Sequence, residues 1–199
     1  MATTIERSLK MRYLCVLAFL LAMCAAGEAR SDQTSEEAFY RSQIIPMALN
    51  VYHEGRGEPE LGQYMIAYVT LMRAADNRKQ WGGKTIKGVV FKGCQFSWTC
   101  DPKIKQKAPS GLAWEKAKAI ATWVALGFFE PPGELLKNAR YYMNPDTSDP
   151  ENRCWMATTF RQAGIVGNHY FYSQDPAWLV PPRFKCGKFV SVEPPELTS

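Results

Sequence analysis

The sequence lacks the features that mark several common protein classes. It has no dense Lys or Arg tract and a mild net charge of +5, so nothing in it indicates a nucleic-acid partner. It also lacks apolar runs of the roughly 20 residues that span a bilayer, which excludes a multi-span membrane protein. Signatures of nucleotide, haem and flavin sites are missing, and we expect no cofactor and no metal. What remains, 46% hydrophobic and 22% charged residues over 199 positions, is typical of one packed globular domain.

Residues 1–26 have the pattern of a secretory signal. Basic residues precede an apolar run at 13–23, and small residues follow at 24–27. We predict cleavage after Ala26. A lipoprotein signal, or an uncleaved anchor that later leaves the membrane, are the two alternatives. All three export the chain to the periplasm or the medium, and an uncleaved anchor would first hold it at the inner membrane. Membrane contact is therefore expected through this segment alone.

Four cysteines follow the signal, at Cys94, Cys100, Cys154 and Cys186. An even set in an exported domain indicates two disulfides rather than free thiols. Cys94 and Cys100 are close enough to close a local loop, which makes Cys154 with Cys186 the natural second pair. No two of them have the Cys-x-x-Cys spacing of a zinc knuckle.

The remaining chain predicts a mostly helical α+β domain over residues 36–190, followed by a flexible tail at 191–199. Apolar residues at helical spacing predict helices over 44–52, 59–77 and 114–126. The second of these is apolar on nearly all sides, so we expect it at the centre of the domain. Extended segments are predicted at 138–145 and within 160–172, where they would form a small β element.

The first concentration of chemistry is the acidic block that starts at Tyr52, with the sequence YHEGRGE. Glu54 stands at the end of a buried helix, beside Tyr52 and two glycines. Desolvation there would raise the pKa of the carboxyl group and make Glu54 a general acid near neutral pH. The alternative is that Glu54 and Glu58 are surface charges paired with Arg56.

His53 and Glu54 also suggest a zinc site. A zincin needs a second His four residues after the first, where this sequence has Gly57. The other histidine, His169, is far along the chain, so we do not expect a metal.

The second concentration is the Cys-bounded loop CQFSWTC at 94–100. Trp98 would offer a face for a sugar ring, while Gln95 and Ser97 would bond sugar hydroxyl and acetamide groups. The alternative is a disulfide hairpin in which Phe96 and Trp98 belong to the core. The sequence leaves both interpretations open.

Four segments in this order resemble a known family: HEGRGEPELGQ, GVVFKGCQFSWTCD, ARYYMNPDT and IVGNHYFY. Together they are similar to the SleB-type cell wall hydrolases, over roughly 44–172. The Cys-bounded loop looks like the version found in Gram-negative bacteria and their phages. Two departures concern loop shape: His53 stands where the family often has Gly or Asn, and the segment 148–154 looks longer than usual.

The resemblance implies a lysozyme-like fold and an enzyme that cuts peptidoglycan glycan strands at the β-1,4 bond between N-acetylmuramic acid and N-acetylglucosamine. Glu54 matches the family's catalytic acid. If the same Glu54 then acts as a base, the product is a 1,6-anhydro sugar, as in a lytic transglycosylase. If Glu58 or Asp101 positions a water, the outcome is hydrolysis, as in a lysozyme. The competing functions are a zinc-dependent peptidoglycan amidase or endopeptidase and a wall-binding module without catalysis.

The resemblance also implies substrate-binding roles. We expect a monomer that contacts the glycan strand and serves as a phage endolysin or a bacterial wall-remodelling enzyme. The residues expected to line the sugar cleft are Glu58, Gln95, Ser97, Trp98, Tyr142, Asn144, Asn168 and His169.

Overall fold

The computed structural model describes residues 33–105 and 107–176, so the predicted signal and the predicted tail lie outside the described residues. The chain divides into two units, one ending at Ser42 and one beginning at Gln43. Residues 33–39 of the first unit are helical, and a π-helical segment follows at Tyr40–Ile44, of which Gln43 and Ile44 belong to the second unit. No helix within the described ranges is long and apolar enough to cross a membrane.

Four helices form the larger part of the second unit: α2 (Ile45–Gly55), α3 (Glu60–Ala75), α4 (Ile86–Val90) and α6 (Gly111–Ala125). The three helices predicted from the apolar spacing are confirmed as α2, α3 and α6. Helix α3 contacts the other three helices and the first strand, so the helix predicted to be central is central. It begins after Pro59, whose extended backbone ends the preceding loop.

Shorter elements connect these helices. The Cys-bounded loop contains a single 3₁₀ turn, and the tight turn after α3 contains another. The connecting elements are η2 (Lys79–Trp81), η3 (Ser97–Thr99), α5 (Pro102–Lys105) and α7 (Glu134–Lys137).

A three-stranded antiparallel sheet completes the unit. Its strands are β1 (Ala139–Met143), β2 (Phe160–Val166) and β3 (His169–Pro176), in the spatial order β1-β3-β2. The extended segment predicted at 138–145 is β1. The second predicted extended segment is two strands joined by a two-residue turn, in which Gly167 has φ +60° and so occupies a conformation suited to glycine.

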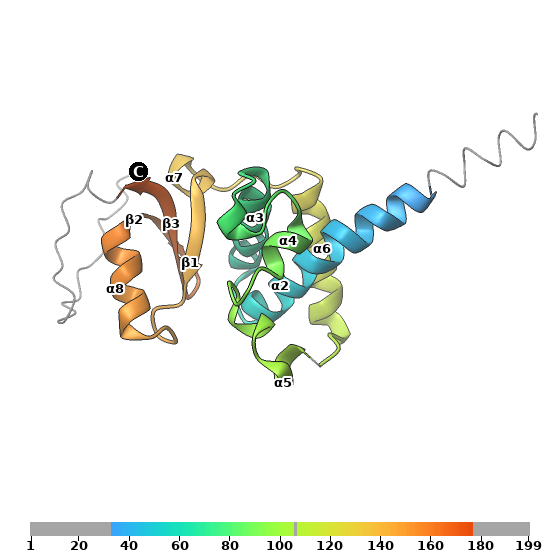
Figure 1. Ribbon diagram of the computed structural model, residues 1–199, viewed down its shortest axis with the longest axis horizontal. Coiled ribbons are helices and arrows are strands. Elements are labelled where there is room, and N and C mark those ends of the chain that lie inside the picture. The colour runs from blue at the N-terminus through green and yellow to red at the C-terminus, as the bar shows by residue number, and fades with distance from the viewer. Residues whose placement is uncertain (1–32, 106, 177–199) are drawn as a thin grey trace, which may run out of the picture. The chain divides into compact units, whose positions relative to one another are not determined.

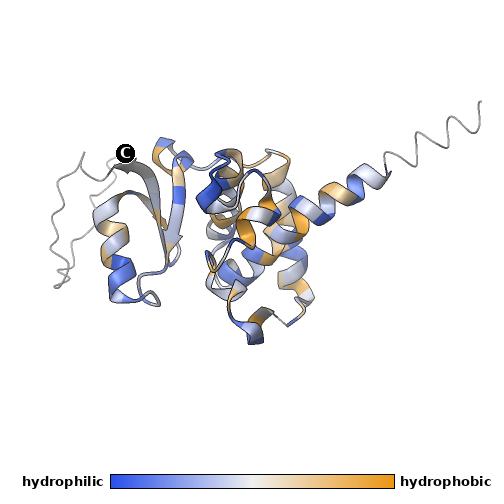
Figure 2. Ribbon diagram, viewed as in Figure 1, coloured by the Kyte–Doolittle hydropathy of each residue, from blue (hydrophilic) through white to orange (hydrophobic). Residues whose placement is uncertain are grey.

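Helix α8 (Pro150–Thr159) precedes β2 and was not predicted. Its mean hydropathy is low, so the sequence shows no apolar stripe, but Asp149 caps it by accepting a hydrogen bond from the backbone N–H of Asn152. The helix lies on the opposite side of the sheet from α2, α3, α4 and α6 (Figure 1). Figure 2 shows its first turn as hydrophilic, in contrast to the hydrophobic colour of α4.

Among the residues that the structure describes, the interior consists of two apolar clusters on either side of α3. One lies among the four helices, and the other lies between α3 and the sheet, around Met65, Val69 and Phe171. Tyr68, Phe129 and Tyr142 pack against both. Because Tyr142 belongs to β1, it brings the sheet into contact with the region where α2 ends.

Candidate active site

Glu54 lies in the last turn of α2, where the helix ends against α3. The neighbouring Gly55 is buried, and a Cβ there would stand 2.9 Å from Ile66 Cδ1 and 3.5 Å from Gln63 Cγ. Glycine thus lets the end of α2 approach α3 closely. Glu54 itself is half-buried.

The environment of Glu54 favours its neutral form. Burial raises the pKa of its carboxyl group to about 7, although the positive charge of Arg73 and a hydrogen bond with the Ser97 side chain both oppose this. A carboxyl group with this pKa can give up a proton and take one back near neutral pH. That is the requirement for a group that acts first as a general acid and then as a general base.

Arg73 supplies the positive charge that faces Glu54 from α3. It is buried, its Nε donates to the backbone carbonyl of Arg140 at 2.6 Å, and a terminal nitrogen donates to Gln95 Oε1 at 3.3 Å. Its guanidinium also lies over the rings of Phe96 and Tyr141. Arg73 therefore fixes the Cys-bounded loop and β1 around the carboxyl group.

Asn50, one helical turn before Glu54, organises a buried polar network. Its Oδ1 accepts a hydrogen bond from the indole N–H of Trp98 at 3.0 Å, and its Nδ2 donates to Thr70 Oγ1 at 3.0 Å. A longer contact of 3.5 Å joins Asn50 Nδ2 to the hydroxyl oxygen of Tyr142. Satisfied buried networks of this kind hold their members in one arrangement.

The sequence left two roles open for the Cys-bounded loop, core packing and contact with a sugar. Phe96 and Trp98 are buried, at 3% and 4% exposure, as the core interpretation required. Trp98 stacks on His53 with ring centroids 4.5 Å apart, so His53 covers one of its faces. Ser97, between them, is exposed and bonds with Glu54. A direct contact of Trp98 with a sugar remains a prediction.

Glu58 is held by the turn between β2 and β3. Its carboxylate accepts hydrogen bonds from the backbone N–H and from the side-chain amide of Asn168, at 2.8 and 3.2 Å. His169 Nδ1 lies 3.4 Å from Glu58 Oε1, an ion-pair distance without hydrogen-bond geometry. Burial lowers the pKa of His169, and the nearby Glu58 charge opposes this. We refer to Glu58, Asn168 and His169 as the clamp.

Two other predicted site residues serve the local structure. Gln95 accepts from Arg73 and donates to the backbone carbonyl of Gln80. Asn144 closes a turn after β1, because its Oδ1 accepts from the backbone N–H of Asp146 at 2.9 Å. Their contacts with substrate stay predictions.

Tyr142 stands between the clamp and Glu54. Its ring meets His169 edge-on, at a centroid distance of 5.3 Å. Burial and the nearby Glu54 charge raise the pKa of Tyr142 well above its ordinary value, so the hydroxyl group keeps its proton. Tyr142 is thus a neutral donor beside the candidate acid.

The sequence reasoning missed Asn50 and Arg73, although each had a signal. Asn50 precedes Glu54 by four residues, which places both on one face of a helix whose other members there are apolar. Arg73 is a charge in a helix that is otherwise apolar on nearly all sides. Polar residues at buried positions need partners, and those partners come from segments far along the chain.

The cysteines agree with the disulfide prediction where the structure describes them. Cys94 and Cys100 are bonded, and Cys154 is also part of a disulfide. Cys186, its predicted partner, lies outside the described residues. Within the described ranges, no three His, Cys, Asp or Glu side chains are placed to hold a metal ion together.

A helical group around a central helix, a small antiparallel sheet and a partly buried acid where they meet define a lysozyme-like α+β domain. The profile of the cell wall hydrolase family matches residues 57–172. The chain belongs to this cell wall hydrolase family, as its four motifs had indicated.

Two related proteins and one solved structure are similar to this chain. The chain is 35% identical to a spore cortex-lytic enzyme of Bacillus cereus over 67% of its own length and 45% of the relative's. It is 32% identical to that of Oceanobacillus iheyensis, over 68% and 43%. It thus spans less than half the length of these relatives. The catalytic domain of the germination-specific lytic transglycosylase SleB from Bacillus anthracis matches with a TM-score of 0.51 and 34% identity, covering 66% of this chain and 93% of that domain.

Proposed function

We propose that this chain is a peptidoglycan-cleaving enzyme of the lytic transglycosylase type, with Glu54 as its general acid and base. The observation that carries the proposal is the pKa of about 7 that burial gives Glu54, in a position bordered by Ser97, Arg73 and Tyr142. The similarity to the SleB catalytic domain supports the same reaction class. The bond that we propose is the β-1,4 linkage from N-acetylmuramic acid to N-acetylglucosamine.

The reaction requires one carboxyl group in two successive roles. Protonated Glu54 donates to the glycosidic oxygen while the bond from that oxygen to C1 of the muramic residue breaks, and C1 becomes oxocarbenium-like. The Glu54 carboxylate then takes the proton from the 6-hydroxyl group of the same sugar as its oxygen attacks C1. The product is a 1,6-anhydro ring, and Glu54 regains its proton without a water molecule.

The alternative of hydrolysis needs a second acid that positions a water. The two acids considered from the sequence are both engaged in other contacts. Glu58 is bound in the clamp. Asp101 Oδ1 accepts a hydrogen bond of 2.8 Å from the backbone N–H of Lys103, at the start of α5. Their engagement favours the single-carboxylate route over the lysozyme-type route.

Mass spectrometry of the soluble products from purified Gram-negative peptidoglycan tests the proposal. We expect muropeptides that end in 1,6-anhydro-muramic acid. Products with reducing ends, heavier by one water, would show that the enzyme is a hydrolase and not a transglycosylase. Free stem peptides with intact glycan would reject the role of Glu54 and favour an amidase.

We also propose that the chain acts outside the cytoplasm, in the periplasm or after secretion, as a phage endolysin or as a bacterial wall-remodelling enzyme. The disulfides at Cys94–Cys100 and at Cys154 support an oxidising compartment. Expression of the full chain should lyse or remodel the host wall, whereas a chain without residues 1–26 should stay inside the cell without effect. Equal wall damage by both would reject export through this segment.

A further inference from the structure

One stretch of the chain carries positive charge without any compensating acid. Between Asn77 and Cys100 there is no Asp or Glu, although the chain as a whole has 19 of them. The same stretch contains five basic residues, namely Arg78, Lys79, Lys84, Lys87 and Lys92. The site around Glu54 uses none of them.

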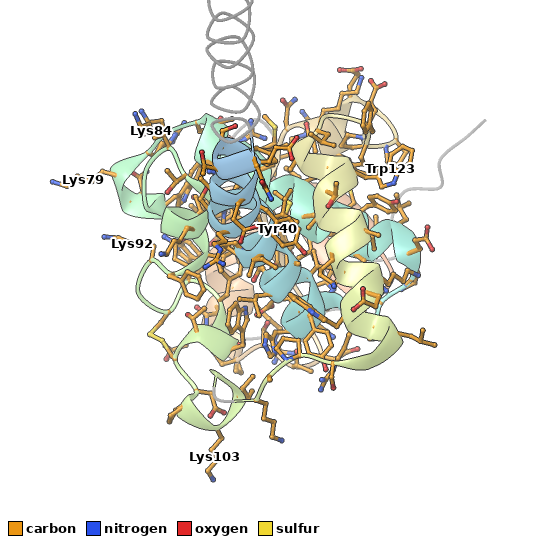
Figure 3. All side chains as sticks on the ribbon, turned by 90° about the vertical axis from the view of Figure 1, so that its right-hand side faces the viewer. Tyr40, Lys79, Lys84, Lys92, Lys103 and Trp123 are labelled. Atoms are coloured by element: carbon orange, nitrogen blue, oxygen red, sulfur yellow. A yellow bond between two sulfur atoms is a disulfide. The ribbon has the colours of Figure 1, made fainter. Side chains whose placement is uncertain are left out.

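The fold gathers this charge around a hollow beside α4, which we call the basic groove. The groove has a volume of about 670 Å³, within the range of roughly 300–1,000 Å³ found for ligand sites, and Lys79, Lys87 and Lys92 line it. Figure 3 shows Lys79 and Lys92 extending from the same edge of the molecule as Lys84. No acidic residue is among the residues that line the groove.

Glycine backbone forms the base of the groove. Gly82 has φ +106°, and a Cβ on it would stand 2.1 Å from the carbonyl oxygen of Gly88. A Cβ on Gly88 would stand 2.4 Å from the carbonyl oxygen of Gly82. The two backbone segments therefore touch, and no larger residue could replace either glycine without moving the turn. Both glycines line the groove, so no side chain fills it at these two positions.

The lysines of the groove differ from those lysines of the second unit that have acidic partners. Lys116 is paired with Glu60, and Lys137 with Glu130 and Glu134. Among the described residues, by contrast, Lys79, Lys87 and Lys92 form no ion pair. Asp76, the nearest acid before the stretch, is already bound to Arg140 at 2.8 Å. The field of the groove is thus left for a ligand.

We propose that the basic groove binds an acidic peptide, namely the carboxylate-bearing stem peptides of the peptidoglycan that Glu54 cleaves; this inference rests on the proposed function. The groove is shallow and open, so an extended, flexible chain can lie along it. Asn77 and Thr85 offer neutral polar groups for peptide amides, and Phe91, 39% exposed, offers an apolar surface at the rim. A second contact of this kind would hold the enzyme on peptide-bearing wall.

Equilibrium co-sedimentation with insoluble sacculi tests the groove. All proteins carry Glu54→Gln so that the wall is not degraded. The groove variant adds Lys79→Gln, Lys87→Gln and Lys92→Gln, and the control instead adds Lys103→Gln, Lys107→Gln and Lys116→Gln, which removes the same charge elsewhere. We expect the groove variant to bind about tenfold more weakly than its parent, as for the loss of three exposed charge contacts.

Three comparisons show whether stem peptides cause the loss. The difference should disappear on glycan strands stripped of peptides, and Lys-to-Arg changes at the three groove positions should restore binding. Equal binding by the groove variant and its parent, or an equal loss in the control, would overturn the proposal. A loss seen with phosphatidylglycerol vesicles and not with sacculi would also overturn it and indicate a lipid surface.

The outcome is separable from that of the proposed function. Digestion of peptide-free glycan by the wild-type chain tests Glu54 chemistry alone. If that digestion fails while binding to sacculi still depends on the groove, the proposed function is rejected and the groove is retained as a binding site. Thermal unfolding of every variant confirms that each is folded before binding is compared.

Discussion

The two glutamates of the acidic block lie four residues apart and have opposite surroundings. Glu58 is bound by backbone and side-chain groups of Asn168 and faces His169, so its carboxylate has its partners inside the protein. Glu54 has a hydrogen bond with Ser97 and lies near the positive charge of Arg73, and burial keeps its pKa near 7. A carboxylate with its hydrogen bonds complete secures structure, whereas one that is desolvated with few partners is ready for proton transfer.

The two glutamates also have different roles, because Glu58 joins two parts of the domain and Glu54 is the candidate acid. The clamp joins the loop after α2 to the β2–β3 turn, and a Cβ on Gly167 would stand 2.3 Å from Glu58 Oε2. Tyr142 connects this junction to the side of Glu54. Substitutions at Glu54 should therefore alter chemistry, and substitutions in the clamp should alter stability first.

The largest expected effect is that of Glu54→Gln on activity. The amide keeps the shape of the side chain but cannot donate the proton, so release of soluble muropeptides should fall by at least about 100-fold, the scale of general acid catalysis. Glu60→Gln, on the exposed first turn of α3, is the matched control and should keep its rate. Lysis retained by the Glu54 variant would remove this residue from the catalytic role.

Glu58→Ala should act mainly on stability. It leaves the N–H of Asn168 and the ring of His169 without their charged partner, which should lower the free energy of unfolding by about 2–3 kcal/mol. Denaturant unfolding measures this. Glu60→Ala, which breaks an exposed pair with Lys116, should cost less than about 1 kcal/mol. Equal losses from both substitutions would mean that the clamp does not stabilise the junction.

The raised pKa of Glu54 predicts a pH dependence of stability. The folded chain holds this proton up to about pH 7, while the unfolded chain releases it near 4.5, so the folded state binds more protons between these values. The free energy of unfolding should therefore fall as pH rises from 4.5 through 7, by about 3 kcal/mol for this group. Unfolding of wild type and Glu54→Gln across this range isolates the group, because other titrations cancel. Parallel curves would contradict the raised pKa.

The smallest effect is expected for Ser97→Ala. Its hydrogen bond lowers the pKa of Glu54, so its removal should raise that pKa and move the alkaline limb of the activity profile to higher pH. At pH 7 the acid form can at most double, so the rate gain from protonation should stay below about twofold. The pH profile of kcat/KM measures the shift. A limb that moves to lower pH would show that the hydrogen bond favours the neutral acid instead.

Much of the helical part could be predicted because its signals are local. The apolar spacing before Glu54 and the nearly all-apolar helix after Pro59 gave α2 and α3 within a few residues. Helix α8 was not predicted, because its mean hydropathy is low and its cap at Asp149 is the main local signal. Strand β2 was not predicted as a separate strand, because Arg161, Gln162 and Gly164 interrupt the alternation of apolar residues that marks a strand.

By itself, the sequence determined the central helix, the position of Glu54 at a helix end, the disulfide loop and, through its motifs, the family. Each of these depends on residues close together in the chain. Only the tertiary structure decided how far the pKa of Glu54 is raised, that Trp98 is buried behind His53, and that Asn50 and Arg73 lie beside Glu54 and Trp98. Burial and hydrogen bonding depend on which distant segments meet, and they set the pKa of a carboxyl group more strongly than its neighbours in the chain do.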